Sequence, residues 1–228
     1  MDYKKCYQKM DNSRLATYEL TVQNVLKLLG HKKEGRVLDI GCGNGIIDIM
    51  LANQTNFKIT GCDISDVALN EAKKNAEKER ATIIFEKQDV FKLDYPDNYF
   101  DVVFSFGYAS TASFRGAQER IYRILKPGGL LILDFVNHLS LYKVLRFRKN
   151  LIRFRVYKNE KTKYYHFGGL GIREYFEKIG FSFVSKIYFN TYPPIKFIPA
   201  KIYILFENTI GRLFRKILGR VILVCFQK

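Results

Sequence analysis

Three glycines at alternate positions, Gly41, Gly43 and Gly45, directly follow a short apolar run that contains Asp39. A glycine turn at the carboxyl end of a strand lets a ligand approach the backbone closely, because glycine has no Cβ and adopts positive φ freely. The spacing G-x-G-x-G differs from the G-x-G-x-x-G dinucleotide fingerprint, since Ile46 stands where the third glycine would be. Taken alone, the turn fits a nucleotide-like ligand and a purely conformational role equally well.

Two acidic residues strengthen the ligand interpretation. Asp63 closes a predicted strand over 58–62 and comes 18 residues after Gly45, where a doubly wound sheet places an acid on the hydroxyl pair of a ribose. Asp89 follows a third predicted strand over 82–85. The carboxyl ends of parallel strands meet at one edge of a sheet, so the pattern favours a ligand that contains a nucleoside.

The elements that must position these residues alternate between strand and helix, which is typical of an α/β fold with a parallel sheet. Helices are predicted at 11–29, 46–51, 66–80, 114–125 and 170–179 from apolar spacing and capping residues. Further strands are predicted at 100–106, within 125–134 after a Lys-Pro-Gly-Gly turn, at 181–189 and at 221–226. A last helix, about 201–218, follows three prolines.

With these motifs in order, residues 35–135 resemble the class I S-adenosylmethionine-dependent methyltransferases. The resemblance implies a doubly wound, seven-stranded, mostly parallel sheet of order 3-2-1-4-5-7-6 with helices on both faces. The last two strands would form an antiparallel hairpin at the sheet edge, with the extra helix inserted before the final strand. The implied cofactor is S-adenosyl-L-methionine, and the implied product is S-adenosyl-L-homocysteine.

The resemblance also assigns residues to parts of the cofactor. The glycine turn would lie against its methionine and ribose portions, Asp63 would accept from both ribose hydroxyls, and Asp89 would accept from the adenine amino group. Ser105 and Phe106 would mark the strand end where the methionyl part meets the acceptor. The full set of implied cofactor-binding residues is Asp39, Gly41, Gly43, Gly45, Asp63, Ile64, Asp89, Val90, Ser105 and Phe106.

Length and composition predict a single domain, because 228 residues with 47% hydrophobic content can bury one substantial α/β core. We expect an N-terminal helical cap over 1–34 and a cofactor-binding core over 35–135. A substrate lid inserted after the fifth strand is expected over 136–168, followed by C-terminal helices and the edge hairpin over 169–228. This domain organisation is the frame for the charge distribution.

The formal net charge of +16 is concentrated in the C-terminal part of the chain. Residues 1–140 carry 19 cations against 18 acids, whereas residues 141–228 carry 19 cations against 4 acids. The predicted lid is rich in arginine and aromatic residues and follows the strand edge at which ligands bind. A field of one sign favours an anionic partner, whether a small-molecule, glycan or lipid-linked acceptor, a nucleic acid or an anionic membrane. A solvated basic face is the alternative.

Methyl transfer from a sulfonium requires alignment and exclusion of water, and it needs a base only when the accepting atom is a protonated oxygen or a poor amine. His138, three residues beyond the expected end of the fifth strand, is the predicted catalytic base, with His166 as the second choice. A lid or capping role for His138 is the alternative. Phe106 and Tyr108 could hold the sulfonium by their aromatic faces.

Two other functions remain open. One is an RNA or nucleic-acid methyltransferase, or an RNA-binding protein, that uses the basic half. The Asn/Asp-Pro-Pro-Tyr motif of amino methyltransferases that act on bases is replaced by Ser-Phe-Gly-Tyr over 105–108, which argues against base methylation. The other is a non-catalytic relative, and the presence of Asp39, Asp63 and Asp89 argues against it.

The predicted last helix is basic and amphipathic. Its apolar face, Ile202, Phe206, Ile210, Leu213 and Ile217, could pack on the sheet, or the helix could lie on an anionic membrane with Arg212, Arg215 and Lys216 nearby. Residues 1–10 lack an apolar signal core, and no apolar run has the length of a membrane span. The four cysteines lack C-x-x-C spacing, so we expect neither disulfides nor a metal site, and a reducing, cytoplasmic location.

Overall fold

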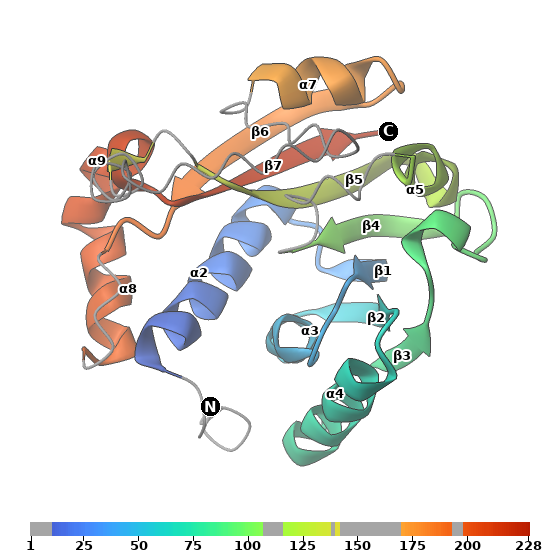
Figure 1. Ribbon diagram of the computed structural model, residues 1–228, viewed down its shortest axis with the longest axis horizontal. Coiled ribbons are helices and arrows are strands. Elements are labelled where there is room, and N and C mark those ends of the chain that lie inside the picture. Colours follow the sequence, from blue (N-terminus) through green and yellow to red (C-terminus); the bar gives the residue numbers. More distant parts are fainter. Residues whose placement is uncertain (1–10, 107–115, 138–139, 142–169, 193–197) are drawn as a thin grey trace, which may run out of the picture.

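The structure is a computed structural model, and it describes residues 11–106, 116–137, 140–141, 170–192 and 198–228. The described strands form one seven-stranded sheet of order β3-β2-β1-β4-β5-β7-β6, which confirms the predicted fold and strand order (Figure 1). The strands are β1 (Glu34–Ile40), β2 (Asn56–Asp63), β3 (Ile84–Lys87), β4 (Phe100–Ser105), β5 (Leu125–Val136), β6 (Ser182–Phe189) and β7 (Val221–Gln227).

The first five strands run parallel, so their carboxyl ends lie at one edge of the sheet. β7 is antiparallel to both β5 and β6, which closes the sheet with the predicted edge hairpin. It follows that β6 ends at the same edge as β5, since both are antiparallel to the strand between them. The connection from β6 to β7 therefore begins at the edge where the glycine turn lies.

The two longest described helices begin at residues whose side chains cap them. Asp11 accepts from the backbone N–H of Arg14 at the start of α2 (Asn12–Leu29), and Gly30 follows its last turn with positive φ. Ser65 caps α4 (Asp66–Glu79) in the same way, by accepting from Ala68. The other helices are α3 (Ile46–Ala52), the short 3₁₀ helix η1 (Val90–Lys92), α5 (Gln118–Ile124), α7 (Leu170–Glu177), α8 (Ala200–Asn208) and α9 (Ile210–Leu218).

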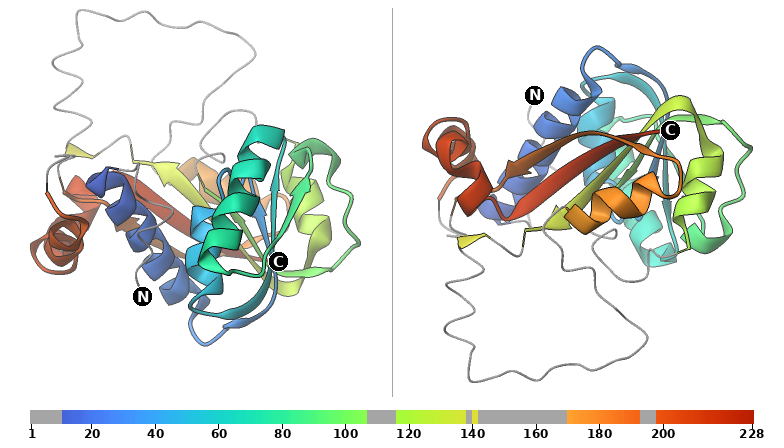
Figure 2. Two further views of the ribbon diagram at one scale, coloured as in Figure 1. Left: turned by 90° about the horizontal axis from the view of Figure 1, so that it is seen from below. Right: turned by 90° about the horizontal axis from the view of Figure 1, so that it is seen from above.

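Apolar side chains pack on both faces of the sheet. On one face, α2, α3 and α8 bury side chains such as Leu20, Met50 and Tyr203 against Val37 and neighbouring strand residues. On the other face, α5 and α7 bury Ile121 and others against the same strands. Figure 2 shows α5 and α7 on the side of the sheet opposite to α2. Strands covered on both faces leave only their ends for a ligand.

Three sequence expectations need correction. The third strand is β3 (Ile84–Lys87), two residues later than predicted, because its pairing with Thr60–Asp63 of β2 sets its position. The turn before the fifth strand pairs with β4 through an irregularity in register, so β5 already begins at Leu125. The last helix divides at Thr209, whose backbone (φ −107°, ψ −102°) leaves the helical region.

Other expectations are confirmed within a few residues, including α2, α4, α7, β6 and β7. The helix predicted over 114–125 is observed as α5, with residues 116–117 in a turn before it and residues 114–115 outside the described residues. His138, Tyr108, His166 and most of the predicted lid lie outside the described residues. In the part of the chain that the structure describes, no helix combines the length and the apolar character needed to span a membrane.

Candidate functional site

A small pocket lies at the carboxyl ends of β1 and β2 and beside the segment that follows β3. Five residues predicted from the sequence line it together, namely Gly41, Asp63, Ile64, Asp89 and Val90. Three further residues, which we did not assign to the site from the sequence, complete the lining: Ile40, Cys62 and Gln88. Each directly precedes a predicted site residue. Their place in the lining depends on the strand register, which the structure supplies.

The glycine turn is hydrogen-bonded to the end of β2. The backbone N–H groups of Gly41 and Cys42 donate to the carbonyl oxygen of Cys62 over 2.8 and 3.0 Å. The N–H of Gly43 donates to Oδ2 of Asp63 over 3.0 Å, and the N–H of Ser65 donates to Oδ1 over 2.9 Å. These bonds hold the Asp63 carboxylate at the pocket, beside the turn.

Asp89 is held in a similar way at the next strand end. Its Oδ1 accepts from the backbone N–H of Phe91 over 2.9 Å and caps η1. The N–H of Gln88 donates to the carbonyl of Asp63 over 3.2 Å, which ties the segment after β3 to the end of β2. Two carboxylates therefore line one pocket from adjacent strand ends, and the exposed side chain of Ile64 belongs to the same lining.

The three glycines of the turn have positive φ values but different surroundings. A Cβ on Gly43 (φ +56°) would meet no atom within 4 Å, whereas a Cβ on Gly45 (φ +71°) would lie 2.8 Å from Cζ of Phe85 and 3.1 Å from Cβ of Ala72. Gly41 (φ 78°) lines the pocket itself. Gly43 thus leaves open space at the turn, and Gly45 allows α4 and β3 to pack closely on it.

Below the turn, Asp39 and Asp48 form a buried carboxyl pair. Asp39 is 3% exposed and Asp48 is fully buried. Burial raises the pKa of Asp39 to about 7, while a hydrogen bond to Asp48 lowers it. Burial and the charge of Asp39 hold the pKa of Asp48 well above its ordinary value. The raised pKa of both groups favours a protonated state of the pair beneath the glycine turn, in which one carboxyl can donate to the other.

The sequence missed Asp48. It lies on α3, three residues after Gly45, and its only signal was an acid on an otherwise apolar helix. Asp134, near the end of β5, adds to the negative field on Asp39. Asp39 does not line the pocket, and its described contact is with Asp48.

The end of β4 presents two predicted site residues in different roles. Ser105 is fully buried, and its hydroxyl donates to the carbonyl oxygen of Ile40 over 3.0 Å, which ties β4 to β1. The ring of Phe106 stacks on Phe104 with 5.4 Å between centroids. Residues 107–115, which follow Phe106, lie outside the described part, as does the predicted base His138.

The two cysteines near the turn have no reactive character. Burial raises the pKa of both the Cys42 and the Cys62 thiol, so both stay protonated at neutral pH. Cys42 is half-buried, whereas Cys62 is buried. Among the described residues, Cys42, Cys62 and Cys225 form no disulfide, and no cluster of metal-ligating side chains occurs.

This lining fits an adenosine-containing cofactor. Asp63 offers a carboxylate for a hydroxyl pair, Asp89 offers another for an amino group, and the turn has open space above Gly43. A family model described as a methyltransferase domain matches residues 37–129, the segment that contains every lining residue of the pocket. Residues 37–129 carry a methyltransferase domain, on the fold of class I S-adenosylmethionine-dependent methyltransferases.

Solved structures of such methyltransferases share this fold. An S-adenosylmethionine-dependent methyltransferase from Thermotoga maritima matches all of this chain and 95% of its own, with a TM-score of 0.63 at 21% identity. Identity at this level supports the fold alone.

Two curated relatives match the methyltransferase domain more closely in sequence. Phosphoethanolamine N-methyltransferase 3 of Arabidopsis thaliana is 34% identical over 117 residues, 50% of this chain and 24% of its own length. Demethylmenaquinone methyltransferase of Thermus thermophilus is 33% identical over 107 residues, 46% of this chain and 49% of its own length. The matches thus span half or less of these relatives.

Proposed function

We propose that the protein transfers a methyl group from S-adenosyl-L-methionine to an oxygen or nitrogen atom of a small-molecule, glycan or lipid-linked acceptor that carries negative charge. The observation that carries the proposal is the pocket onto which Asp63 and Asp89 converge beside an open glycine turn. Two acids at adjacent strand ends suit the ribose hydroxyls and the adenine amino group of this cofactor.

In this proposal the residues of the pocket bind the cofactor and orient it. Asp63 accepts from both ribose hydroxyls, and the exposed apolar side chain of Ile64 offers the adenine ring a surface to pack on. Asp89 accepts from the adenine amino group through Oδ2, because Oδ1 is engaged with Phe91. When bound, the cofactor supplies an electrophilic methyl group on a sulfonium. His138 remains the proposed base for an acceptor that must lose a proton.

The proposed acceptor class rests on the charge distribution and on the relatives. The Arabidopsis relative is named for phosphoethanolamine and the Thermus relative for demethylmenaquinone, two chemically different acceptors. A core shared by such relatives binds the cofactor in common, so selection of the acceptor falls to the region beyond residue 129, where the family match ends. That region holds nearly all of the net positive charge, which favours an anionic acceptor.

The test is a methyl-transfer screen with labelled S-adenosyl-L-methionine over anionic small molecules, glycans, lipids and RNA. We expect transfer to an anionic small, glycan or lipid acceptor, and loss of transfer in Asp63→Ala. Transfer to RNA, with RNA binding that falls steeply as salt is raised, would replace this proposal with the nucleic-acid alternative. Failure of the protein to bind the cofactor at all would refute it.

A further inference from the structure

A row of large apolar side chains on α8 and α9 faces solvent. Their exposed fractions range from 45% for Phe214 to 81% for Leu213. We call this surface the apolar ridge; it consists of Ile202, Leu205, Ile210, Leu213, Phe214 and Ile217. Single exposed apolar residues are ordinary on a protein surface, but six on two consecutive helices form a patch of the kind that marks an interaction site.

On α9 the ridge occupies one helical face. Residues 210, 213, 214 and 217 follow the spacing i, i+3, i+4 and i+7, which surface helices ordinarily turn toward the core. Here the opposite face is turned inward, with Gly211 buried and Arg215 and Leu218 half-buried. Of the two alternatives that the sequence left open for this apolar face, packing on the sheet therefore does not hold on α9.

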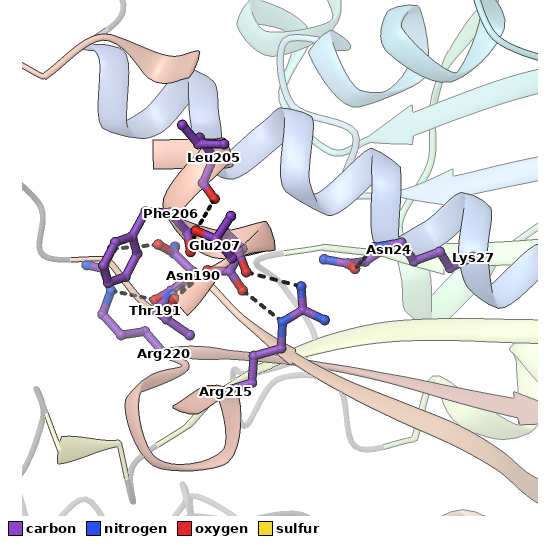
Figure 3. Close-up of polar contacts among 10 residues, drawn as sticks. Asn24, Lys27, Asn190, Thr191, Leu205, Phe206, Glu207, Arg215 and Arg220 are labelled. Carbon is purple, nitrogen blue, oxygen red and sulfur yellow. Dashed lines mark hydrogen bonds and ion pairs between the residues drawn. The ribbon is translucent and has the colours of Figure 1, made fainter. Parts of the chain in front are cut away.

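Specific contacts hold α9 in this orientation. Gly211 lies so close to Thr191 that an added Cβ would be 2.2 Å from its hydroxyl oxygen. Arg215 places Nε 3.3 Å from Oε1 of the fully buried Glu207 (Figure 3). Oε2 of Glu207 accepts from the backbone N–H and the hydroxyl of Thr191 over 2.7 and 2.8 Å.

Rotating α9 to bury the ridge would leave the carboxylate of Glu207 buried without its cation, which is strongly unfavourable. The same rotation would put a larger side chain in the place of Gly211, against Thr191. The outward position of the ridge is therefore a consequence of the packing of α8 and α9.

The ridge lies at the edge of the sheet that carries the cofactor pocket. Nδ2 of Asn137, directly after β5, donates to the carbonyl of Gly219 over 2.7 Å, and the hydroxyl of Ser140 donates to the carbonyl of Leu218 over 2.7 Å. In Figure 1, the arrow of β4 points toward the side of the molecule on which α8 and α9 lie. A surface that covered the ridge would thus lie beside the carboxyl ends of the strands.

Charge indicates what covers the ridge. Residues 200–220 contain five cations and one acid, and that acid is the buried Glu207. Lys201, Arg212 and Lys216 are exposed beside the ridge. A symmetric dimer through this surface would bring the same cations of two copies together, which opposes association. An anionic lipid surface satisfies both features, because it accepts apolar side chains below its headgroups and attracts cations to them.

We propose that α8 and α9 dock on an anionic lipid membrane through the apolar ridge, so that the edge carrying the cofactor pocket faces the bilayer and the acceptor is drawn from it. The identity of the acceptor rests on the proposed methyl transfer. Docking itself does not, because it depends only on the ridge and the cations beside it.

Flotation of the full chain with vesicles tests the docking. We expect binding to phosphatidylcholine vesicles that contain phosphatidylglycerol, and at least about 10-fold weaker binding to phosphatidylcholine alone. Leu213→Glu combined with Ile217→Glu should weaken binding at least about 10-fold, because two charges enter the face that contacts the acyl chains. Ile84→Glu is the matched control, since Ile84 is 59% exposed at the start of β3, at the opposite end of the strand order from β6, and should leave binding unchanged.

Three results would overturn the docking proposal. The first is no binding to phosphatidylglycerol vesicles. The second is undiminished binding by the double variant, which would reduce the interaction to charge. The third is a concentration-dependent dimer in the wild type that the double variant abolishes, which would assign the ridge to a second copy of the chain. Calorimetric titration with S-adenosyl-L-methionine confirms that each variant is folded. Vesicle binding is measured without any methyl transfer, so the docking proposal can succeed or fail independently of the proposed activity.

Discussion

The backbone N–H of Gly43 donates to Oδ2 of Asp63 across 3.0 Å, so a direct hydrogen bond joins the glycine turn after β1 to the acid at the end of β2. The residues are 20 positions apart in the chain and meet because β1 and β2 pair in parallel, with Ile40 opposite Cys62. Asp63 therefore has two functions, in holding the turn and in lining the pocket.

Replacing Asp63 by alanine should weaken binding of S-adenosyl-L-methionine about 10- to 100-fold, a loss on the order of 1.5–3 kcal/mol, since an acceptor for two hydroxyls is removed. Calorimetric titration with the cofactor or with S-adenosyl-L-homocysteine measures this. Glu71→Ala, which removes an exposed carboxylate of α4 outside the pocket, is the matched control and should bind normally. Unchanged affinity in Asp63→Ala would contradict the assignment of Asp63 to the cofactor site.

Gly43→Ala and Gly45→Ala should separate the ligand-facing part of the turn from its packed part. At Gly43 the new Cβ meets no protein atom, so only the left-handed backbone costs stability, about 1 kcal/mol. At Gly45 the Cβ also meets Phe85, and the cost should be about 2–4 kcal/mol. Urea unfolding of the two variants compares these losses.

The Gly43→Ala and Gly45→Ala variants should also differ in cofactor binding. Gly43→Ala should weaken cofactor binding more than its small loss of stability suggests, because the new methyl group occupies space that is open to the ligand. Equal stability losses in the two variants would contradict the close packing of Phe85 on Gly45.

Asp48→Asn should change how stability depends on pH. Burial raises the pKa of Asp39 and Asp48 in the folded protein, so the folded state holds protons that the unfolded chain releases above its ordinary carboxyl pKa. Stability from the protonated pair is therefore complete below that ordinary value and is lost as pH rises toward about 7. The side-chain amide of the Asp48→Asn variant would donate to Asp39 without this proton and would remove most of the loss.

We therefore expect the free energy of unfolding of the wild type, relative to Asp48→Asn, to fall by about 2 kcal/mol between pH 5 and pH 8. Urea unfolding at a series of pH values measures the difference, and effects common to both proteins cancel. Parallel pH profiles would show that the two carboxyls do not share a proton.

Arg153→Ala combined with Arg155→Ala tests whether the basic segment after β5 selects the acceptor. Arginine forks suit carboxylates and phosphates, so kcat/KM for the true acceptor should fall on the order of 10-fold while cofactor affinity is retained. Added salt should reproduce part of the loss by screening. Lys73→Ala with Lys74→Ala removes the same charge from the exposed face of α4 and should have no such effect. Undiminished turnover without salt sensitivity would show that the positive charge of this segment belongs to a solvated surface and does not select the acceptor.

The sequence by itself determined the alternation of strands and helices and most of the cofactor pocket, while the strand order was implied by the family resemblance. Gly41, Asp63 and Asp89 were predictable because each stands at or just beyond the end of a strand, and parallel pairing brings strand ends together whatever packs around them. The helices α2 and α4 were predictable because their capping residues and apolar spacing are local properties of the chain.

Only the tertiary structure decided the different roles of Gly43 and Gly45 in the turn and the orientation of the C-terminal helices. Gly43 and Gly45 are equivalent by spacing, and only the position of Phe85 makes one open and the other packed. Helical periodicity located the apolar face of α9 but not its direction, because the direction follows from Glu207, Thr191 and Gly211. A periodic pattern reports which side chains share a face, whereas long-range contacts decide whether that face meets the core or the solvent.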